Sequence, residues 1–446
     1  MSSEWKSYQL GDIFDLVNGF AFKGGEFKSS GIPVIKIKNV KPNNLLLSDL
    51  AFVDKDVADK RPDKELKRGD ILITMSGNRM DGSRDTWVGK VAYFDIPGRY
   101  MLNQRVGVLR PKKGVEVDRK CCSYFLSSDE FQDFFIAVAT SSGGQANLSP
   151  SQILGEKINL PPLAEQKQIA SLLTSLDDRI TLLRETNTTL EAIAQALFKS
   201  WFVDFDPVHA KMQGRAPEGM DEATADLFPD SFEGSELGPV PKGWRVERLG
   251  EVCSYLNRGI SPKYLEEGGV LVINQKCIRD FSVDYSKARR HDKAQRKIDG
   301  RQLVVGDILV NSTGVGTLGR VAQVLTSNEV VIVDSHVTVV RAGGKLSWPY
   351  LGQWMTRQQP NIEAMGEGST GQTELARSKL SVMPILVPSV DALRLFDEVV
   401  TSLKERIAVN EACVSELAKL RDTLLPRLIS GQLQLPDAQQ NFEEAL

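Results

Sequence analysis

The 446-residue chain has the composition of an ordinary globular protein, with 41% hydrophobic and 25% charged residues. Acidic residues outnumber basic ones, 58 to 55, so bulk positive charge is excluded as a basis for nucleic-acid binding, although local basic surfaces are not. No stretch approaches the ~20 apolar residues that span a membrane, and no secretory signal pattern opens the sequence. Five cysteines without a C-x-x-C pair and three histidines predict a cytoplasmic chain with free thiols and no metal site.

A tandem repeat of long period organises the sequence. Short strings recur in the same order at an offset that falls slowly from 239 to 227 residues, which makes chance agreement implausible. The matched strings are WKSYQLG from Trp5 and WRVERLG from Trp244; LKRGDILI from Leu66 and LVVGDILV from Leu303; VGKVA from Val88 and LGRVA from Leu318; VGVLR from Val106 and VTVVR from Val337; Gly144-Gln145 and Gly371-Gln372; and INLPPLAEQ from Ile158 and ILVPSVDAL from Ile385.

The first part of each copy is predicted to be a mixed domain dominated by strands. Apolar and β-branched runs separated by Gly, Asn, Asp and Pro clusters are typical of short strands. In the first copy these runs are Pro33–Val40, Ile71–Thr74, Val88–Phe94 and Val106–Leu109, with a helix near Ser123–Val138. The copies differ most in a polar, Gly-rich loop, 74–87 in one and 311–317 in the other. A shared scaffold with different loops indicates two related binding sites.

The second part of each copy is predicted to be a long helix with a heptad pattern. Apolar residues spaced alternately by four and three over four heptads favour a coiled-coil seam, and the alternative is a helix packed on its own domain. The first seam is Ile169, Leu173, Leu176, Ile180, Leu183, Asn187, Leu190, Ala194 and Leu197, and the second is Phe396, Val400, Leu403, Ile407, Asn410, Val414, Leu417, Arg421 and Leu424.

Two asparagines in the seams favour an antiparallel coiled coil. A parallel pair in the register of the repeat would leave Asn187 and Asn410 facing apolar residues, at about 1–3 kcal/mol for each unpaired amide. An antiparallel pair with a local two-fold near position 185 places them opposite each other, although it also places Arg421 opposite Leu176. A slipped parallel register stays open.

The seam has the length of a spacer along DNA. Its 28-residue span from Ile169 to Leu197 corresponds to about 42 Å at ~1.5 Å per residue, near one ~34–36 Å turn of B-DNA. Because each domain precedes its helix, antiparallel helices would carry the two domains at opposite ends. The sequence thus indicates a spacer that holds two reading domains on one duplex.

Two segments have unbalanced charge. Residues 202–243 hold nine acids and three Lys or Arg, a net charge of −6, and we interpret this stretch with WFVDFDPVHAK from Trp201 as a partner-docking segment; the alternative is a disordered acidic linker. Residues 276–301 hold nine Lys or Arg and four Asp, a net charge of +5, and could face phosphates or be a solvated loop.

Three motifs imitate catalytic sites, and we reject each. Gly314-x-Gly316-x-x-Gly319 matches a dinucleotide fingerprint, but the β-branched residues after it predict a turn between strands and not a helix. Asp54, Glu65 and Lys67 imitate a nuclease, yet the second copy lacks the last two. The string NLPP from Asn159 is weakly similar to a methyltransferase motif. It is better explained as the proline-containing stop that precedes the helix.

The chain resembles the specificity (S) subunits of type I restriction–modification systems over essentially its full length. The resemblance is sharpest at NLPPLAEQKQIASLL (159–173), ALFKSWFVDFDPV (196–208), FPDSFEGSELGPVPKGW (228–244) and LRDTLLPRLISGQL (420–433). It implies two target recognition domains that each read half of a bipartite, asymmetric DNA site, and helices that separate them and dock modification (methyltransferase) subunits, expected to be two. Catalysis, with S-adenosylmethionine, ATP and Mg, would belong to those partners and to any restriction or translocase subunit that joins.

The resemblance does not transfer base-reading residues, so we predict them from loop position and hydrogen-bonding capacity. Some of these residues would contact phosphate only, and His336 could equally be a structural hydrogen-bonding residue. The DNA-binding candidates are Ser76, Asn78, Arg79, Arg84, Thr86, Gln104, Arg105, Gln145 and Asn147 in the first copy, and Asn311, Ser312, Thr313, Thr317, Arg320, Ser335, His336 and Gln372 in the second.

The expected architecture is an α+β fold with a pseudo-two-fold tandem repeat. The expected parts are recognition domain 1 (1–158), a first spacer helix (159–200), an acidic linker and docking segment (201–243), recognition domain 2 (244–384), a second spacer helix (385–430) and a tail (431–446). The leading hypothesis is a non-catalytic specificity subunit. The alternatives are a standalone nuclease or methyltransferase and a coiled-coil adaptor without a DNA role.

Overall fold

The computed structural model describes residues 5–79, 84–142, 144–327, 329–367 and 373–433. The chain forms two compact units: unit 1 holds residues 1–181 and 414–446, and unit 2 holds 182–413. Both unit boundaries fall inside long helices, α6 (Leu163–Phe202) and α12 (Val390–Ile429). Each unit therefore combines one strand-rich part with segments of both helices. Within the described residues, no helix is long and apolar enough to cross a membrane.

Unit 1 contains two four-stranded sheets and three smaller ones. The first sheet has the order β10-β8-β12-β2, all antiparallel, and the second has the order β11-β4-β7-β3, with a parallel pairing of β11 on β4. The strands are β1 Lys6–Gln9, β2 Phe14–Asn18, β3 Phe27–Lys28, β4 Ile32–Ile35, β5 Val40–Lys41, β6 Asn44–Leu45, β7 Ala51–Val53, β8 Asp70–Thr74, β9 Ser76–Gly77, β10 Val91–Phe94, β11 Met101–Leu102, β12 Val106–Pro111, β13 Thr140–Ser142, β14 Gln145–Asn147 and β15 Lys157–Leu160.

Unit 2 repeats the strand order of the two four-stranded sheets. Its first sheet, β26-β25-β28-β19, has the order of β10-β8-β12-β2, and its second sheet again contains one parallel pairing, β27 on β21. The strands are β16 Phe232–Ser235, β17 Gly238–Pro241, β18 Arg245–Arg248, β19 Cys253–Arg258, β20 Tyr264–Leu265, β21 Val270–Ile273, β22 Ile278–Arg279, β23 Ser282–Val283, β24 Arg289–His291, β25 Ile308–Asn311, β26 Val321–Gln323, β27 Val331–Val333, β28 Val337–Ala342 and β29 Pro384–Val387.

Some of the shorter helices also recur. In unit 1, α3 and α4 follow the first sheet where the sequence predicted one helix; the break falls at Ser127-Ser128, where Ser128 becomes the N-cap of α4. Unit 2 has the single α10 at this place. The shorter helices are α1 Leu10–Ile13, α2 Lys55–Asp59, α3 Arg119–Leu126, α4 Asp129–Val138, α5 Pro150–Leu154, α7 Asp206–Met212, α8 Glu222–Asp226, α9 Leu249–Val252, α10 Trp348–Ala364 and α11 Arg377–Ser381.

A buried ion pair occupies the same place in both units. In unit 1, Arg110 on β12 donates from Nε and Nη2 to Asp70 at the start of β8, at 2.8 and 2.6 Å. In unit 2, Arg341 on β28 donates to Asp307 at 2.6 and 2.7 Å, and Asp307 is fully buried. Each carboxylate raises the pKa of its arginine through these hydrogen bonds. Bidentate pairing of this kind fixes both strands in register.

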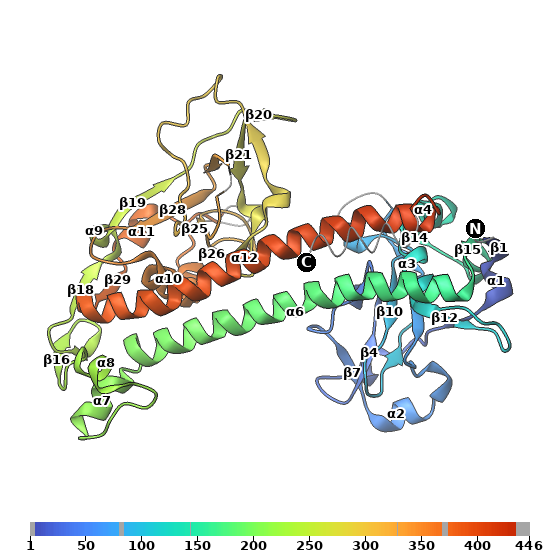
Figure 1. Ribbon diagram of the computed structural model, residues 1–446, viewed down its shortest axis with the longest axis horizontal. Coiled ribbons are helices and arrows are strands. Elements are labelled where there is room, and N and C mark those ends of the chain that lie inside the picture. The colour runs from blue at the N-terminus through green and yellow to red at the C-terminus, as the bar shows by residue number, and fades with distance from the viewer. Residues whose placement is uncertain (1–4, 80–83, 143, 328, 368–372, 434–446) are drawn as a thin grey trace. The chain divides into compact units, whose positions relative to one another are not determined.

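The long helices run antiparallel in each unit, as the fold prediction expected (Figure 1). In unit 2, Asn410 on α12 donates to Asn187 on α6 at 2.7 Å, the pairing that the sequence predicted. In unit 1, Arg421 on α12 donates to Asp177 on α6 at 2.9 Å. Within unit 2, Glu191 pairs with Lys404 and Asn187 with Asn410, so the partner's number falls along α12 as the number rises along α6, which defines an antiparallel pair.

The predicted starts of the spacer helices are wrong by a few residues. Residues 157–160 and 384–387 are strands β15 and β29, which pair with β1 and β18, so the helices begin at Leu163 and Val390. The alternating burial of Ile158 and Leu160 shows why: these residues fit a strand period of two and not a helical period.

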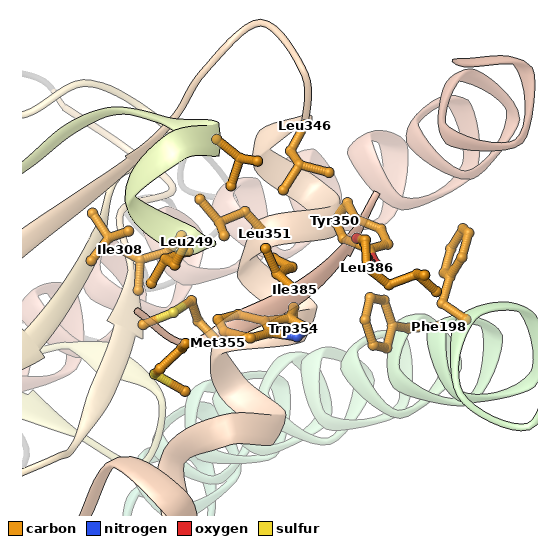
Figure 2. Close-up of a cluster of buried hydrophobic side chains, with 14 of the residues drawn as sticks. Phe198, Leu249, Ile308, Leu346, Tyr350, Leu351, Trp354, Met355, Ile385 and Leu386 are labelled. Carbon is orange, nitrogen blue, oxygen red and sulfur yellow. Dashed lines mark hydrogen bonds between the residues drawn. The ribbon is translucent and has the colours of Figure 1, made fainter. Parts of the chain in front are cut away.

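The segment 201–243 is folded and not an unstructured linker. It forms α7, α8 and the β16–β17 hairpin, and the aromatic side chains that suggested partner docking pack inside unit 2. Trp201 and Phe202 belong to a large hydrophobic cluster with Phe396, and Phe198 and Tyr350 of the same cluster are drawn in Figure 2. These rings stabilise unit 2, so they are not available as a docking surface.

We predict that Asp307→Asn lowers the free energy of unfolding of unit 2 by about 3 kcal/mol, because it leaves Arg341 without its buried counter-charge. Calorimetric unfolding of the purified chain measures this loss. The matched control is Glu329→Gln, which breaks the exposed pair with Arg290 and is expected to cost about 0–1 kcal/mol. Equal losses in the two variants would contradict the role given to the buried pair.

We also predict that Asn410→Leu destabilises unit 2 by about 1–3 kcal/mol, because Oδ1 of Asn187 then lacks its hydrogen-bond donor. The double variant Asn187→Leu/Asn410→Leu should recover most of that loss, since both polar groups leave the seam together. Urea unfolding of the single and double variants measures the difference. If the double variant lost as much as the sum of the two single variants, the amides would not be paired.

Candidate nucleic-acid interface

Three predicted DNA-binding residues of unit 1 meet in one polar cluster. The Ser76 hydroxyl donates to Asn147 Oδ1 at 2.6 Å, and Arg105 Nη1 donates to Asn147 Oδ1 at 2.9 Å and to Ser76 Oγ at 3.3 Å. The pairing of β14 with β9 brings Asn147 and Ser76 together, although they are 71 positions apart in sequence. Ser76 is buried and Arg105 is exposed.

Unit 2 builds a cluster at the same place from different side chains. The Thr313 hydroxyl and His336 Nδ1 lie 2.9 Å apart, and the His336 backbone N–H donates to Asp334. Thr313 forms a bridge with Glu374, whose carboxylate accepts from Arg258 at 2.6 Å. Burial raises the pKa of Asp334, while the N–H of His336 opposes that shift.

The two clusters occupy equivalent positions of the repeat. Strands β12 and β28 begin directly after Arg105 and His336, so these residues correspond at the 231-residue offset of that part of the repeat. At the 237 and 227 offsets of the flanking strings, Ser76 corresponds to Thr313 and Asn147 to Glu374. The scaffold is therefore shared, whereas the hydrogen-bonding groups that it presents differ.

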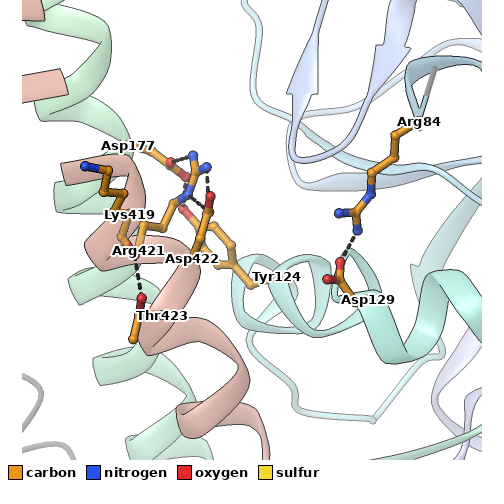
Figure 3. A network of polar contacts seen from close by, with 8 residues as sticks. All are labelled: Arg84, Tyr124, Asp129, Asp177, Lys419, Arg421, Asp422 and Thr423. Carbon is orange, nitrogen blue, oxygen red and sulfur yellow. Dashed lines mark hydrogen bonds and ion pairs between the residues drawn. The ribbon is translucent and has the colours of Figure 1, made fainter. Parts of the chain in front are cut away.

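The other candidates of unit 1 differ in how their side chains are engaged by hydrogen bonds and ion pairs. Asn78 donates to the Thr86 hydroxyl at 3.1 Å, and Arg79 donates to the Ala139 carbonyl at 2.6 Å. Arg84 forms an exposed ion pair with Asp129 (Figure 3). Because exposed pairs contribute little stability, Arg84 could exchange its partner for a phosphate at small cost. Gln104 and Gln145 are exposed.

The remaining candidates of unit 2 divide into buried and exposed groups. Asn311 and Ser312 are fully buried; Asn311 donates to the Gln275 carbonyl, and Ser312 shares a hydrogen bond with Thr338, so both support the loop instead of facing solvent. Thr317, Arg320 and Ser335 are half-buried. Gln372 lies outside the described residues.

Gly314, Gly316 and Gly319 form a turn between β25 and β26, as predicted, and all three have positive φ angles. The look-alike nuclease residue Glu65 accepts hydrogen bonds from Arg99 with both oxygens. The dinucleotide fingerprint is therefore a β-turn feature, and the carboxylate of Glu65 is engaged in an ion pair.

The basic strip 276–301 is mostly exposed, but several of its charges are already engaged. Arg290 pairs with Glu329, and Arg296 donates to the Ser261 carbonyl. Arg289 lies over the Tyr264 ring at 3.4 Å. A phosphate-facing role for this strip stays a prediction.

The predicted coiled-coil residues differ in burial along the seam. Leu173, Leu176, Ile180 and Leu183 on α6 and Val400, Ile407, Asn410 and Leu417 on α12 are buried, whereas Asn187, Leu190, Leu403 and Val414 are half-buried. Near the half-buried leucines, Lys404 is 6% exposed and donates to Glu191 at 2.6 Å. On α12 the buried position therefore shifts by one residue, from Leu403 to Lys404. Such a shift is expected because a straight α-helix drifts relative to a 3.5-residue repeat.

Sequence reasoning missed Glu374, Asp334, Arg258 and the Glu191–Lys404 pair. Lys404 lowers the pKa of Glu191 against the opposing effect of burial, and Gln353 also donates to Glu191. Continuing the 227-residue offset from Gly144-Gln145 would have aligned Glu374 with Asn147. No sequence pattern indicated the Glu191–Lys404 ion pair, because neither residue falls on the predicted heptad positions.

A family model matches the N-terminal part of the chain. Residues 2–192 match the family model for the type I restriction modification DNA specificity domain. The match covers less than half of the chain, and the strand order of its two four-stranded sheets recurs in unit 2.

Curated specificity subunits are similar over nearly the whole chain. The HindI specificity subunit of Haemophilus influenzae is 24% identical and is covered completely by 97% of this chain. The putative MjaX specificity subunit of Methanocaldococcus jannaschii is 22% identical over 97% of this chain and 94% of its own length. A crystal structure of a type I S subunit from M. genitalium shares the fold, with a TM-score of 0.59 and 17% identity, and 96% of both chains is covered.

The chain also has a groove in unit 2 next to the start of α12. The groove has a volume of about 700 Å³ and is lined by residues that include Ser347, Val390 and Asp397. Burial raises the pKa of Asp397 to about 6, and a hydrogen bond from Ser347 opposes this shift only in part. The folded chain therefore holds this proton more tightly than the unfolded chain does.

We predict that stability falls as the pH rises from about 4 to about 6, because Asp397 must then lose its proton inside the fold. The variant Asp397→Asn stays neutral, so its melting temperature relative to the wild type should rise across this window. Thermal unfolding between pH 4 and pH 7.5 measures the change. Glu398→Gln, at a 60% exposed side chain in the same groove, is the control and should show no such trend. A pH-independent difference for Asp397→Asn would contradict the assignment.

Proposed function

We propose that the chain is the DNA sequence-specificity subunit of a type I restriction–modification complex, and that each unit reads one half of a bipartite, asymmetric site. The observation that carries this proposal is the pair of equivalent polar clusters. Ser76, Arg105 and Asn147 present one set of donors and acceptors, and the same scaffold positions in unit 2 present another. Two related surfaces with different hydrogen-bonding groups suit two different base sequences.

The antiparallel helices would set the distance between the half-sites. Their polar pairs support this role, because a hydrogen-bonded Asn187–Asn410 pair and a Glu191–Lys404 pair each favour one register over its neighbours. A slip by one heptad would leave the buried Lys404 and the buried amide of Asn410 without partners. The register, and with it the spacing of the two units, would thus be held fixed.

The catalytic steps would belong to partner subunits. In this proposal the chain has no catalytic activity; it docks modification subunits, expected to be two, of a DNA adenine methyltransferase, and a restriction or translocase subunit would make the complex an ATP-dependent endonuclease. S-adenosylmethionine, ATP and Mg would bind in those partners. The complex would act in the cytoplasm, where its double-stranded DNA is found.

We predict that a host gaining this chain together with its modification subunit acquires a new methylated motif with two defined halves and a fixed gap. Methylome sequencing measures the motif. Replacing residues 1–158 with the recognition domain of another specificity subunit should change one half only, because unit 2 and its contacts are untouched. A complex that assembles and methylates without any defined motif would refute the proposed function.

A further inference from the structure

Arg105 is an exposed arginine whose side chain is held in place by neutral groups. In the part of the chain that the structure describes, only Nη1 is engaged, donating to Asn147 Oδ1 at 2.9 Å and to Ser76 Oγ at 3.3 Å. Ser76 is 2% exposed and Asn147 lies on β14, so both acceptors belong to ordered parts of unit 1. No carboxylate within the described residues pairs with Arg105, so its charge is oriented but not neutralised.

One edge of this guanidinium remains available. Among the described residues, Nε and Nη2 of Arg105 have no hydrogen-bond acceptor, whereas both neighbouring arginines are engaged. Arg79 donates to a backbone carbonyl and Arg84 pairs with Asp129. Nε and Nη2 form the planar two-donor fork that matches two acceptors lying side by side.

The backbone at Arg105 is unusual for a residue with a side chain. Its φ angle is +72°, in the left-handed region that favours glycine. Residues held in this region cluster at functional sites, because the surrounding structure must maintain them there. Here the Arg105 carbonyl accepts from the Met75 N–H at 2.8 Å, which ties the strained residue to the chain next to Ser76.

We propose that Arg105 reads a guanine through the major groove, with Nε and Nη2 donating to O6 and N7 of that base. These two acceptors lie side by side only on guanine, and a bidentate arginine is the commonest specific contact to it. Asn147 and Ser76 would be positioning residues that hold the guanidinium before the DNA arrives. A guanidinium already ordered loses little conformational entropy on binding.

The equivalent position in unit 2 supports a role in specificity. There the repeat places His336, whose Nδ1 lies 2.9 Å from the Thr313 hydroxyl, and Glu374 replaces Asn147. An imidazole and a carboxylate cannot present the fork of Arg105. The two half-sites should therefore differ at the base pair that this position reads.

This inference rests on the proposed function, so the first measurement is the methylome of cells with the wild-type chain and its modification subunit. The half assigned to unit 1 by domain replacement should contain a guanine that Arg105→Ala relaxes to any base, while the other half stays unchanged. Arg105→Lys keeps the charge but loses the fork, and it should relax the same position. Arg68→Ala removes an exposed arginine paired with Asp95 in the same unit and should leave the motif intact.

A binding measurement then tests the atoms involved. The probe is a duplex in which 7-deazaguanine replaces that guanine, so that N7 is missing as an acceptor. The wild-type complex should bind this duplex more weakly than the normal one. The loss should stay below the roughly 5- to 150-fold expected for a whole bidentate contact, because O6 remains as an acceptor. The Arg105→Ala complex should bind both duplexes equally, because it makes no contact to N7.

The possible outcomes distinguish a failure of the proposed specificity function from a failure of the Arg105–guanine contact. No motif with the wild-type chain would defeat the proposed function itself. A wild-type motif that Arg105→Ala leaves unchanged at every position would overturn the guanine contact alone. Uniformly weaker binding to all sequences, with an unchanged motif, would show that Arg105 contacts phosphate. Unfolding temperatures equal to the wild type confirm that the variants are folded, and Arg105→Lys serves if Arg105→Ala is not.

Discussion

The bidentate Asp–Arg pair at the centre of each unit is the interaction on which the shared scaffold depends. Asp70–Arg110 and Asp307–Arg341 join the same two strands, and each carboxylate also accepts a backbone N–H three residues before it. Each arginine further donates to a carbonyl of the loop before that strand. One buried pair thus fixes two strands and a turn, and the loops beyond them are free to differ.

A second set of polar contacts gives the helix pairs their register. Apolar side chains alone would tolerate a slip by one heptad, because leucine packs against leucine in either register. Asn187–Asn410 and Glu191–Lys404 in unit 2 lose their partners in any other register. In unit 1 Arg421 lies between Asp177 and Asp422, and Tyr124 also donates to Asp177, which links α3 to the helix pair (Figure 3). These polar pairs distinguish one register from another, which apolar packing alone does not.

Much of the fold could be predicted because the tandem repeat supplies two sequences for the same element, so that each assignment can be checked in both copies. The antiparallel pairing followed from two asparagines, since each amide needs a partner. Other features depend on contacts distant in sequence. Strand β29 looked like the start of a helix until its partner β18 was known, and the aromatic run from Trp201 looked like a docking surface until Phe396 and Tyr350 were seen to cover it. The binding surface was predicted only in outline, because burial separates Asn311 and Ser312 from exposed neighbours of the same chemistry.

Two equivalent units are proposed to read two half-sites independently. The methylome given by a chain in which residues 244–384 also replace residues 5–158 tests this independence. Two identical units joined by antiparallel helices should give a motif whose two halves are the same sequence on opposite strands. A motif that keeps the original first half, or that differs between its halves, would show that the units do not read independently.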